Sequence, residues 1–248
     1  MTVVFDLDGT TIFNGNKMTS EMEKAIKLLS FHERIVFASA RPIRDMLPVL
    51  PIAFHNYDLI GGNGAFVKQN NVLTTSAFSE EESQTIFNVI RKHNLNYLVD
   101  SDWNYSFSGD KDHPLYQGLD PDKTAKNLPI ERIKPIVKSV LFTTNPDIIN
   151  ELKTVGINVH FHGNEQLIDI SPNGISKWTG FNQLDIVDNF IMFGNDANDI
   201  PMFKNASKSF IVGNLIDGLP NTTNISKEKV IETILSLANP IKEEVETI

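Results

Sequence analysis

Two aspartates separated by one residue follow a short apolar run near the start of the chain. Residues 3–5 form the apolar run, and residues 6–10 read Asp-Leu-Asp-Gly-Thr. A short apolar run predicts a buried parallel strand, and Gly9 allows a sharp backbone turn after it. Asp6 could then attack a phosphorus atom and form an acyl phosphate. Asp8 could protonate the leaving oxygen and later activate water. An ordinary surface turn is the alternative for this segment taken alone.

A second polar cluster follows another apolar run. Residues 190–193 predict a buried strand that ends at Gly194. Crowded carboxylates repel one another unless a cation joins them, and a set of oxygen ligands suits Mg²⁺. The chain has no cysteine, which excludes disulfides and thiolate metal sites. A structural turn is the alternative. The candidate metal ligands are Asp6, Asp8, Asn195, Asp196 and Asp199.

Three further residues could hold an anion. Ser39 follows the predicted strand at 35–38, where its hydroxyl and free backbone amides could donate to phosphoryl oxygens. Arg41 could help to bind the same anion. Lys177 could stabilise charge on a transferring phosphoryl group. The alternatives are a helix cap for Ser39 and solvated surface charges for Arg41 and Lys177.

The predicted elements bring these groups to one edge of a sheet. Strands and helices alternate over the first 62 residues and again after Lys177, which predicts an α/β fold with a doubly wound parallel sheet. Ligands of such sheets bind at the carboxyl ends of the strands. Ser79 and Glu82 have the spacing of a capping box at the start of a helix. From Ser79 the order changes to α-β-β-α-β-α-β-β, which indicates an α+β insert. We therefore predict a core of residues 1–78 and 172–248 and an insert of residues 79–171. The tail after residue 221 is expected to be helical at best.

The composition excludes several classes of protein. The 248 residues are 41% hydrophobic and carry a formal net charge of −9. This balance is typical of a soluble globular protein, and it disfavours nucleic acid as a partner. No apolar run approaches the roughly 20 residues of a membrane span. With no recognisable signal peptide and no cysteine, we expect a cytoplasmic protein without a membrane partner.

Together these segments resemble the haloacid dehalogenase superfamily of phosphatases. The resemblance lies in the order, spacing and strand context of the Asp-x-Asp-Gly-Thr segment, Ser39, Lys177 and residues 194–199, and it spans nearly the whole chain. The insert lies where this superfamily carries a type-2 cap, and its element order resembles the C2B class. Residues 63–65, Asn-Gly-Ala, and the pair Asn198-Asp199 with a following methionine look like the Cof-type branch.

The resemblance implies a function and roles for individual residues. It implies a Mg²⁺-dependent phosphomonoester hydrolase that acts on a small phosphorylated metabolite such as a sugar phosphate. Asp6 would be the nucleophile and Asp8 the acid/base. The metal would take the Asp6 side chain, the Asp8 carbonyl and the residue after Gly194. The residues implied to bind the phosphoryl group or the substrate are Ser39, Ala40, Arg41, Lys177 and Asn198.

The chain departs from the family pattern at three positions. Asn195 stands where the family usually has aspartate, Ala40 replaces a usual glycine, and Trp178 replaces a usual small residue. An amide oxygen can ligate Mg²⁺ but brings no charge. We therefore expect weaker Mg²⁺ binding than in relatives, with Asp196 or Asp199 compensating.

Several alternatives stay open at the level of the sequence. Trehalose-phosphate or sucrose-phosphate phosphatases and phosphomannomutases share the cap class, and a degenerate binding protein that lost turnover is a further alternative. In the insert, Trp103, Tyr105 and Phe107 are expected to share one strand face, where they either stack on a substrate or are buried against the helices. His160 and His162 also share a face, but no third metal ligand is evident. A monomer or homodimer is expected.

Overall fold

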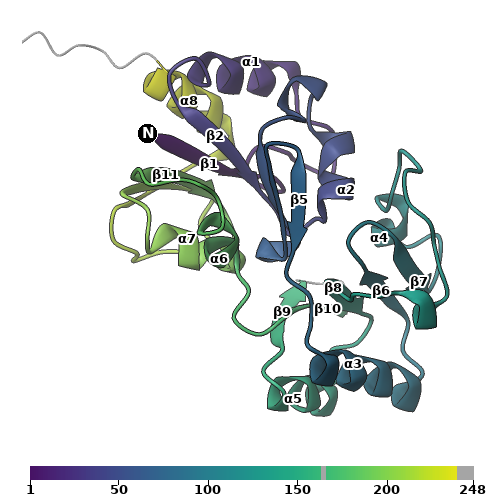
Figure 1. The fold of residues 1–248 in the computed structure, drawn as a ribbon. Coiled ribbons are helices and arrows are strands. Elements are labelled where there is room, and N and C mark those ends of the chain that lie inside the picture. Colours follow the sequence, from purple (N-terminus) through teal and green to yellow (C-terminus); the bar gives the residue numbers. More distant parts are fainter. Residues whose placement is uncertain (163–165, 239–248) are drawn as a thin grey trace, which may run out of the picture. The chain divides into compact units, whose positions relative to one another are not determined.

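The chain forms two compact units. A computed structural model describes residues 1–162 and 166–238 (Figure 1). One unit consists of Met1–Phe37 and Val187–Ile248, and the other of Ala38–Ile186. None of the described helices has the length and apolar character needed to cross a membrane.

The first unit is built on a parallel sheet with the strand order β13-β12-β11-β1-β2. The central strands β1 and β11 are buried along their whole length, as expected for strands that are apolar on both faces. They pair in parallel, with Phe5 opposite Phe193. The strands are β1 (Thr2–Asp6), β2 (Arg34–Ala38), β11 (Phe190–Gly194), β12 (Lys208–Val212) and β13 (Thr222–Ile225).

The helices of the first unit pack through apolar faces. In α1 (Ser20–Leu29) the buried residues are Met22, Ala25, Ile26 and Leu29, the spacing of one helical face. This helix contacts α8 (Val230–Ala238). Between β11 and β12 lie the 3₁₀ turn η5 (Ala197–Asp199) and α7 (Ile200–Phe203), and η6 (Lys227–Lys229) precedes α8.

The expectation of at most helical structure after residue 221 is wrong. Strand β13 pairs in parallel with β12, with Phe210 opposite Thr223. Its sequence, Thr-Thr-Asn-Ile, has no apolar run. A strand on the edge of a sheet does not need one, since backbone hydrogen bonds to its neighbour can hold it. Hydrophobic patterning therefore could not find it.

The second unit begins with short helical turns and an antiparallel group of strands. Strands β3, β4 and β5 pair in sequence order, and β4 and β5 form a hairpin. The hairpin turns at Asn70 and Asn71, both at positive φ, which suits a two-residue turn. The elements are α2 (Ile43–Met46), η1 (Leu47–Val49), η2 (Ile52–Phe54), β3 (Asp58–Gly61), η3 (Gly62–Gly64), β4 (Phe66–Gln69), β5 (Val72–Thr75) and α6 (Lys177–Phe181).

A five-stranded antiparallel sheet forms the rest of the second unit, with the order β7-β6-β8-β10-β9. The observed element sequence confirms the predicted α-β-β-α-β-α-β-β order. All of these elements lie within residues 79–171; the exact boundaries of the insert stay a prediction. They are α3 (Glu80–His93), β6 (Tyr97–Asp100), β7 (Tyr105–Ser108), α4 (Pro114–Gln117), η4 (Ile130–Arg132), β8 (Lys138–Leu141), α5 (Pro146–Thr154), β9 (Asn158–His162) and β10 (Leu167–Ser171).

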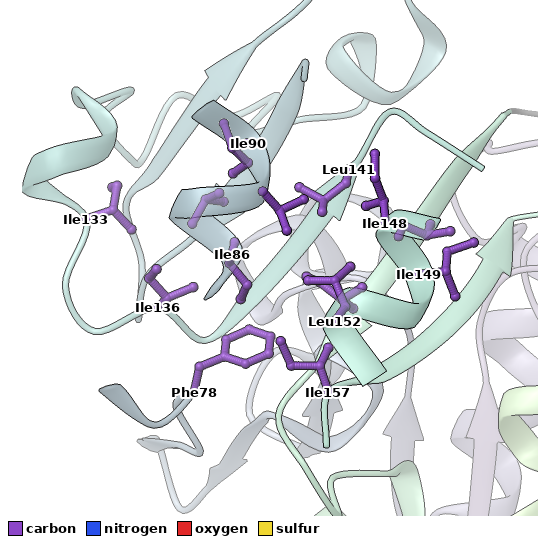
Figure 2. Close-up of a cluster of buried hydrophobic side chains, with 14 residues drawn as sticks. Phe78, Ile86, Ile90, Ile133, Ile136, Leu141, Ile148, Ile149, Leu152 and Ile157 are labelled. Atoms are coloured by element: carbon purple, nitrogen blue, oxygen red, sulfur yellow. The ribbon is translucent and has the colours of Figure 1, made fainter. Parts of the chain in front are cut away.

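One face of this sheet packs against α3 and α5 (Figure 2). Helix α3 begins at a capping box, in which the Glu82 backbone N donates to Ser79 Oγ at 3.2 Å and the Ser79 backbone N donates to Glu82 Oε2 at 2.7 Å. It then buries Ile86, Val89 and Ile90 on one face. Helix α5 adds buried residues such as Leu152. This hydrophobic core holds the sheet against the two helices and leaves its opposite, partly polar face turned away from them.

The opposite face of the sheet also carries a cluster of apolar side chains. Its buried residues include Tyr105, Val140 and Leu167, and the Phe107 ring lies 4.7 Å from the Tyr116 ring. Tyr105 is thus buried and Phe107 partly exposed on the face opposite α3 and α5, where Phe107 packs against Tyr116 of α4. Stacking of these rings on a substrate stays a prediction. Trp103 precedes β7, so the expectation that it shares the strand face is wrong.

A buried arginine ties α2 to the five-stranded sheet. Arg44 donates to both oxygens of Asp45, at 2.9 and 2.7 Å, and to Asp100 Oδ1 at 2.9 Å. It also donates to the Trp103 carbonyl at 2.9 Å, and its guanidinium lies 5.0 Å from the centre of the Tyr105 ring. Burial lowers the pKa of Arg44 and its two carboxylate neighbours raise it, with a net rise. Arg44 is therefore a permanent cation inside the second unit.

The same network reaches a third segment through Asp45. Asp45 Oδ1 accepts a hydrogen bond from the Asp120 backbone N at 2.9 Å. The Asp120 carboxylate in turn accepts from the backbone N of Thr124 at 2.8 Å and of Ala125 at 3.0 Å. Hydrogen bonds to charged groups thus join α2, the end of β6 and the 120–125 turn. Such bonds are stronger than those between neutral groups.

Candidate active site

Asp6 lies at the carboxyl end of β1, directly beside the end of β11. Because Phe5 pairs with Phe193, the next residues, Asp6 and Gly194, leave the sheet at the same edge. Asp6 is 5% exposed. Its backbone carbonyl accepts a hydrogen bond from Thr11 Oγ1 at 2.8 Å, which fixes the chain at this point. Asp8 is exposed.

The chain turns back at once after Asp8. The backbone N of Ile12 donates to the Leu7 carbonyl at 2.8 Å, and that of Gly9 donates to the Ile12 carbonyl at 2.7 Å. Gly9 has φ +86°, a conformation that side chains with a Cβ rarely adopt. The glycine of the motif is therefore required by the turn itself.

A side-chain hydrogen bond joins the loops that follow β1 and β11. Thr10 Oγ1 donates to Asn195 Oδ1 at 3.0 Å. Gly9 lies so close to this amide that a Cβ there would be 2.3 Å from Asn195 Nδ2. The first unit thus brings the Asp6 loop and the Asn195 loop together, as the sequence predicts.

Gly9→Ala is expected to separate these two loops. The added methyl overlaps Asn195, so kcat should fall at least about tenfold if the loops form the reacting site. Gly15→Ala is the matched control, because Gly15 has φ +68° but nothing within 4 Å of a Cβ. Both variants should lose about 1–2 kcal/mol to backbone strain. Equal kcat values for the two variants would contradict the expectation.

Asp199 shapes the loop after β11. It is fully buried, and its Oδ2 accepts from the backbone N of Asn195 at 3.0 Å and of Asp196 at 3.1 Å. Gly194 is needed here too, since a Cβ would lie 2.6 Å from the same oxygen. Asp196 caps the following turn and is exposed. The three-residue spacing of Asp196 and Asp199 is that of a capping box, a signal that predicts this loop-holding role.

The donor set of these two loops fits Mg²⁺. The groups are carboxylate, amide and backbone carbonyl oxygens, the ligands that hard divalent cations prefer. Within residues 1–162 and 166–238, no group of three or more His, Cys, Asp or Glu side chains is placed so that it could hold a metal ion. The residues that would hold Mg²⁺ here are Asp6 and Asn195, with a backbone carbonyl oxygen. Whether Asp196 and Asp199 compensate for Asn195 stays a prediction.

In the second unit, Ser39 begins the segment that leads into α2. Its backbone N donates to the Ile60 carbonyl at 2.8 Å, and its carbonyl accepts from the Asn63 backbone N at 3.0 Å. Its Oγ accepts from the Arg41 backbone N at 3.1 Å and still has its own proton to donate. Ala40 and Arg41 are partly exposed.

Lys177 begins α6 and is 1% exposed, which rules out the alternative of a solvated surface charge. Ser176 and Thr179 form a capping box around it, with bonds of 2.8 and 3.2 Å. A Cβ on Gly64 would lie 2.0 Å from the Ser176 carbonyl O. The Gly62–Gly64 turn therefore contacts both the Ser39 segment and the start of α6.

The remaining candidates are placed less tightly. Asn198 is partly exposed in the loop after β11, beside Asp196 and Asp199. His160 is partly exposed on β9, and the side chain of His162 lies outside the described part of the chain. The first unit thus holds the predicted nucleophile, acid/base, metal ligands and Asn198, and the second unit holds Ser39, Ala40, Arg41 and Lys177.

The chain belongs to the haloacid dehalogenase-like hydrolases. The sequence model of this family matches residues 3–234. The match confirms the predicted superfamily and its Cof-type branch, the predicted fold class and the assignment of the chain as an enzyme. A comparison with curated proteins gave no match.

Solved structures share the fold over nearly the whole chain. One, described as a sugar phosphatase of haloacid dehalogenase subclass IIB, is 17% identical with a TM-score of 0.73, covering 94% of this chain and 99% of its own. A haloacid dehalogenase-like hydrolase from Bacteroides thetaiotaomicron is 19% identical, with a TM-score of 0.74 and coverages of 94% and 97%. A protein from Thermotoga maritima is 21% identical, with a TM-score of 0.74 and coverages of 95% and 96%.

Proposed function

We propose that this chain is a Mg²⁺-dependent phosphomonoester hydrolase that acts on a small phosphorylated metabolite such as a sugar phosphate. One observation carries the proposal: the Asp6 and Asn195 loops leave neighbouring strands at one edge and are joined by the 3.0 Å bond from Thr10. Membership of the hydrolase family supports the reaction type. The neighbour described as a sugar phosphatase supports the class of substrate.

The proposed reaction has two steps, each with a defined proton. Asp6 attacks phosphorus, and the bond from phosphorus to the substrate alcohol breaks as Asp8 gives its proton to the leaving oxygen. Asp8 then takes a proton from a water molecule that attacks the aspartyl phosphate, which releases inorganic phosphate and restores Asp6. The exposure of Asp8 suits a group that must meet both the alcohol and water.

Other residues are proposed to bind the charges. Asp6, the Asp8 carbonyl and Asn195 would hold Mg²⁺, which would offset the negative charge of the phosphoryl oxygens. Ser39 and Lys177 would bind the phosphoryl group. Flanking roles are proposed for Ala40, Arg41 and Asn198 as substrate-binding residues and for Asp196 and Asp199 as compensating ligands.

Asn195→Asp is expected to lower the Mg²⁺ concentration needed for half-maximal activity by about tenfold. The new carboxylate adds a charge at the proposed metal site and can still accept the hydrogen bond from Thr10. The measurement is a Mg²⁺ titration of phosphate release, paired with the Mg²⁺-dependent rise of the melting temperature. Unchanged midpoints in both titrations would contradict the expectation.

The proposal is tested by a screen of phosphorylated metabolites with Mg²⁺ and with a chelator, using Asp6→Asn as the blank. Release of phosphate that depends on both Mg²⁺ and Asp6 is expected. Product analysis separates hydrolysis from transfer to a second sugar, the mutase alternative. A chain that binds phosphorylated compounds but releases no phosphate would be the degenerate binding protein instead.

The cellular location, oligomeric state and partners of the enzyme stay predictions. We propose a cytoplasmic monomer or homodimer whose partner is its small substrate, with neither nucleic acid nor membrane involved. The net charge of −9 supports the first of these exclusions.

A further inference from the structure

A buried asparagine occupies the turn between β3 and β4. Asn63 is 3% exposed and has φ +55°, and it lies between Gly62 and Gly64, whose φ values are +57° and +106°. Its backbone N donates to the Ser39 carbonyl at 3.0 Å. Its side-chain Nδ2 donates to Asp169 Oδ2 at 3.4 Å. The Gly62 backbone N also donates to the Arg41 carbonyl at 2.8 Å. The turn is therefore bonded to the Ser39 segment through its backbone and to the five-stranded sheet through the Asn63 side chain.

The acceptor of that second contact belongs to a buried ion pair. Asp169 on β10 is paired with Lys138 on β8, and the two residues are 1% and 4% exposed. Burying two charges costs several kcal/mol of desolvation per ion, and such pairs often add little net stability over apolar residues of similar volume. Stability alone therefore gives a weak reason for this pair in the middle of a sheet.

The turn is enclosed by the pair and by α6. A Cβ on Gly62 would lie 3.4 Å from the aliphatic Cδ of Lys138, and a Cβ on Gly64 would lie 2.0 Å from the Ser176 carbonyl O. The same three-residue turn thus contacts the ion pair, the Ser39 segment and the backbone directly before Lys177. A shift of the turn would therefore move the Ser39 segment and the backbone before Lys177.

We infer that Lys138 and Asp169 are positioning residues that act through Asn63 to fix the backbone at Ser39 and Lys177. The ion pair holds the acceptor, the acceptor holds the asparagine side chain, and the asparagine backbone holds the Ser39 carbonyl. This inference rests on the proposed function for what Ser39 and Lys177 do. The insert is then a structural support of the phosphate-binding segments, in addition to any role over the substrate.

Asn63→Gly is the direct test, because glycine keeps a positive φ without strain and removes only the side chain. A displacement of about 1 Å can cost about 100-fold in rate, so we expect a 10- to 100-fold loss of kcat. Inhibition by inorganic phosphate should weaken at least fivefold. Asn94→Gly is the matched control, since Asn94 also has a positive φ, at the end of α3, and is exposed. It should keep the wild-type values.

A spectroscopic readout follows the loop without any turnover. Trp178 adjoins Lys177, and its ring stacks on Phe181 with the centroids 5.8 Å apart. In a Trp103→Phe background it is the only tryptophan of the chain. Asn63→Gly should change its emission spectrum and its response to inorganic phosphate, and Asn94→Gly should change neither.

The double variant Lys138→Met/Asp169→Leu separates positioning from stability. Removing both charges should leave the melting temperature near or above that of the wild type, while kcat and the Trp178 spectrum should resemble those of Asn63→Gly. Wild-type kcat, phosphate inhibition and Trp178 emission in both variants would overturn the inference. If the wild type released no phosphate, the proposed function would fail, and the Trp178 spectra would still decide the inference.

Discussion

Asp6→Asn is expected to lower kcat by about 10³-fold or more, with no loss of folding stability. An amide of nearly the same size replaces the proposed nucleophile and cannot form the aspartyl phosphate. The hydrogen bond from Thr11 reaches the backbone carbonyl of residue 6, so the variant keeps it. The variant also lacks the charge that Asp6 would contribute to the proposed Mg²⁺ site, so we expect it to need more Mg²⁺. The measurement is initial-rate phosphate release over a range of Mg²⁺ concentrations.

Asp188→Asn is the control for this variant. Asp188 is exposed in the same unit, so its loss should leave kcat within about twofold of the wild type. Thermal unfolding of both variants checks that each is folded. Full-speed phosphate release by folded Asp6→Asn would refute the proposed nucleophile, whatever Mg²⁺ does.

Arg44→Met is expected to lower the free energy of unfolding by about 3–5 kcal/mol at neutral pH. The change removes the charge that Asp45 and Asp100 share and leaves both carboxylates buried without it. It also removes the donor to the Trp103 carbonyl. Denaturant unfolding is the measurement. Arg91→Met is the control, because its ion pair with Glu131 at 3.6 Å is solvent-exposed and should be worth about 1 kcal/mol or less.

The cost of Arg44→Met should depend on pH with a defined sign. Burial raises the pKa of Asp100 above its ordinary value, and the charge of Arg44 opposes that rise. A carboxyl group whose pKa rises on folding binds more protons when folded, so its contribution to stability falls as pH increases through that window. Without Arg44 the pKa of Asp100 rises further. The difference in free energy of unfolding between wild type and variant should therefore be largest at neutral pH and shrink as the pH falls. A constant difference would show that Asp100 stays ionised in the variant.

Sequence reasoning predicted the parts of the molecule that local patterns encode. The apolar runs at 3–5 and 190–193 are the central strands of the parallel sheet, and the Ser79/Glu82 spacing is the capping box of α3. These succeeded because burial on both faces of a strand, or the first turn of a helix, restricts which residues can occupy consecutive positions.

Long-range polar contacts could not be predicted in this way. Arg44 meets Asp100 across 56 positions, and Asp45 meets the Asp120 backbone across 75. Asn63 meets Asp169 across 106 positions. The residues next to each of these side chains in the sequence do not indicate its partner, because the contact depends on how elements far apart in the chain pack. The candidate site was easier to predict from the sequence, because its loops follow two strands that pair directly.

The Arg44 network also has a consequence for protein engineering. A chimera that transplants only residues 79–171 onto another hydrolase scaffold would carry Asp100 and Asp120 away from Arg44 and Asp45. The transplanted module would then hold the Asp100 carboxylate without Arg44, and the Asp120 backbone N would lose its acceptor on Asp45. A chimera that transfers the insert of this protein should therefore also transfer α2, which carries Arg44 and Asp45.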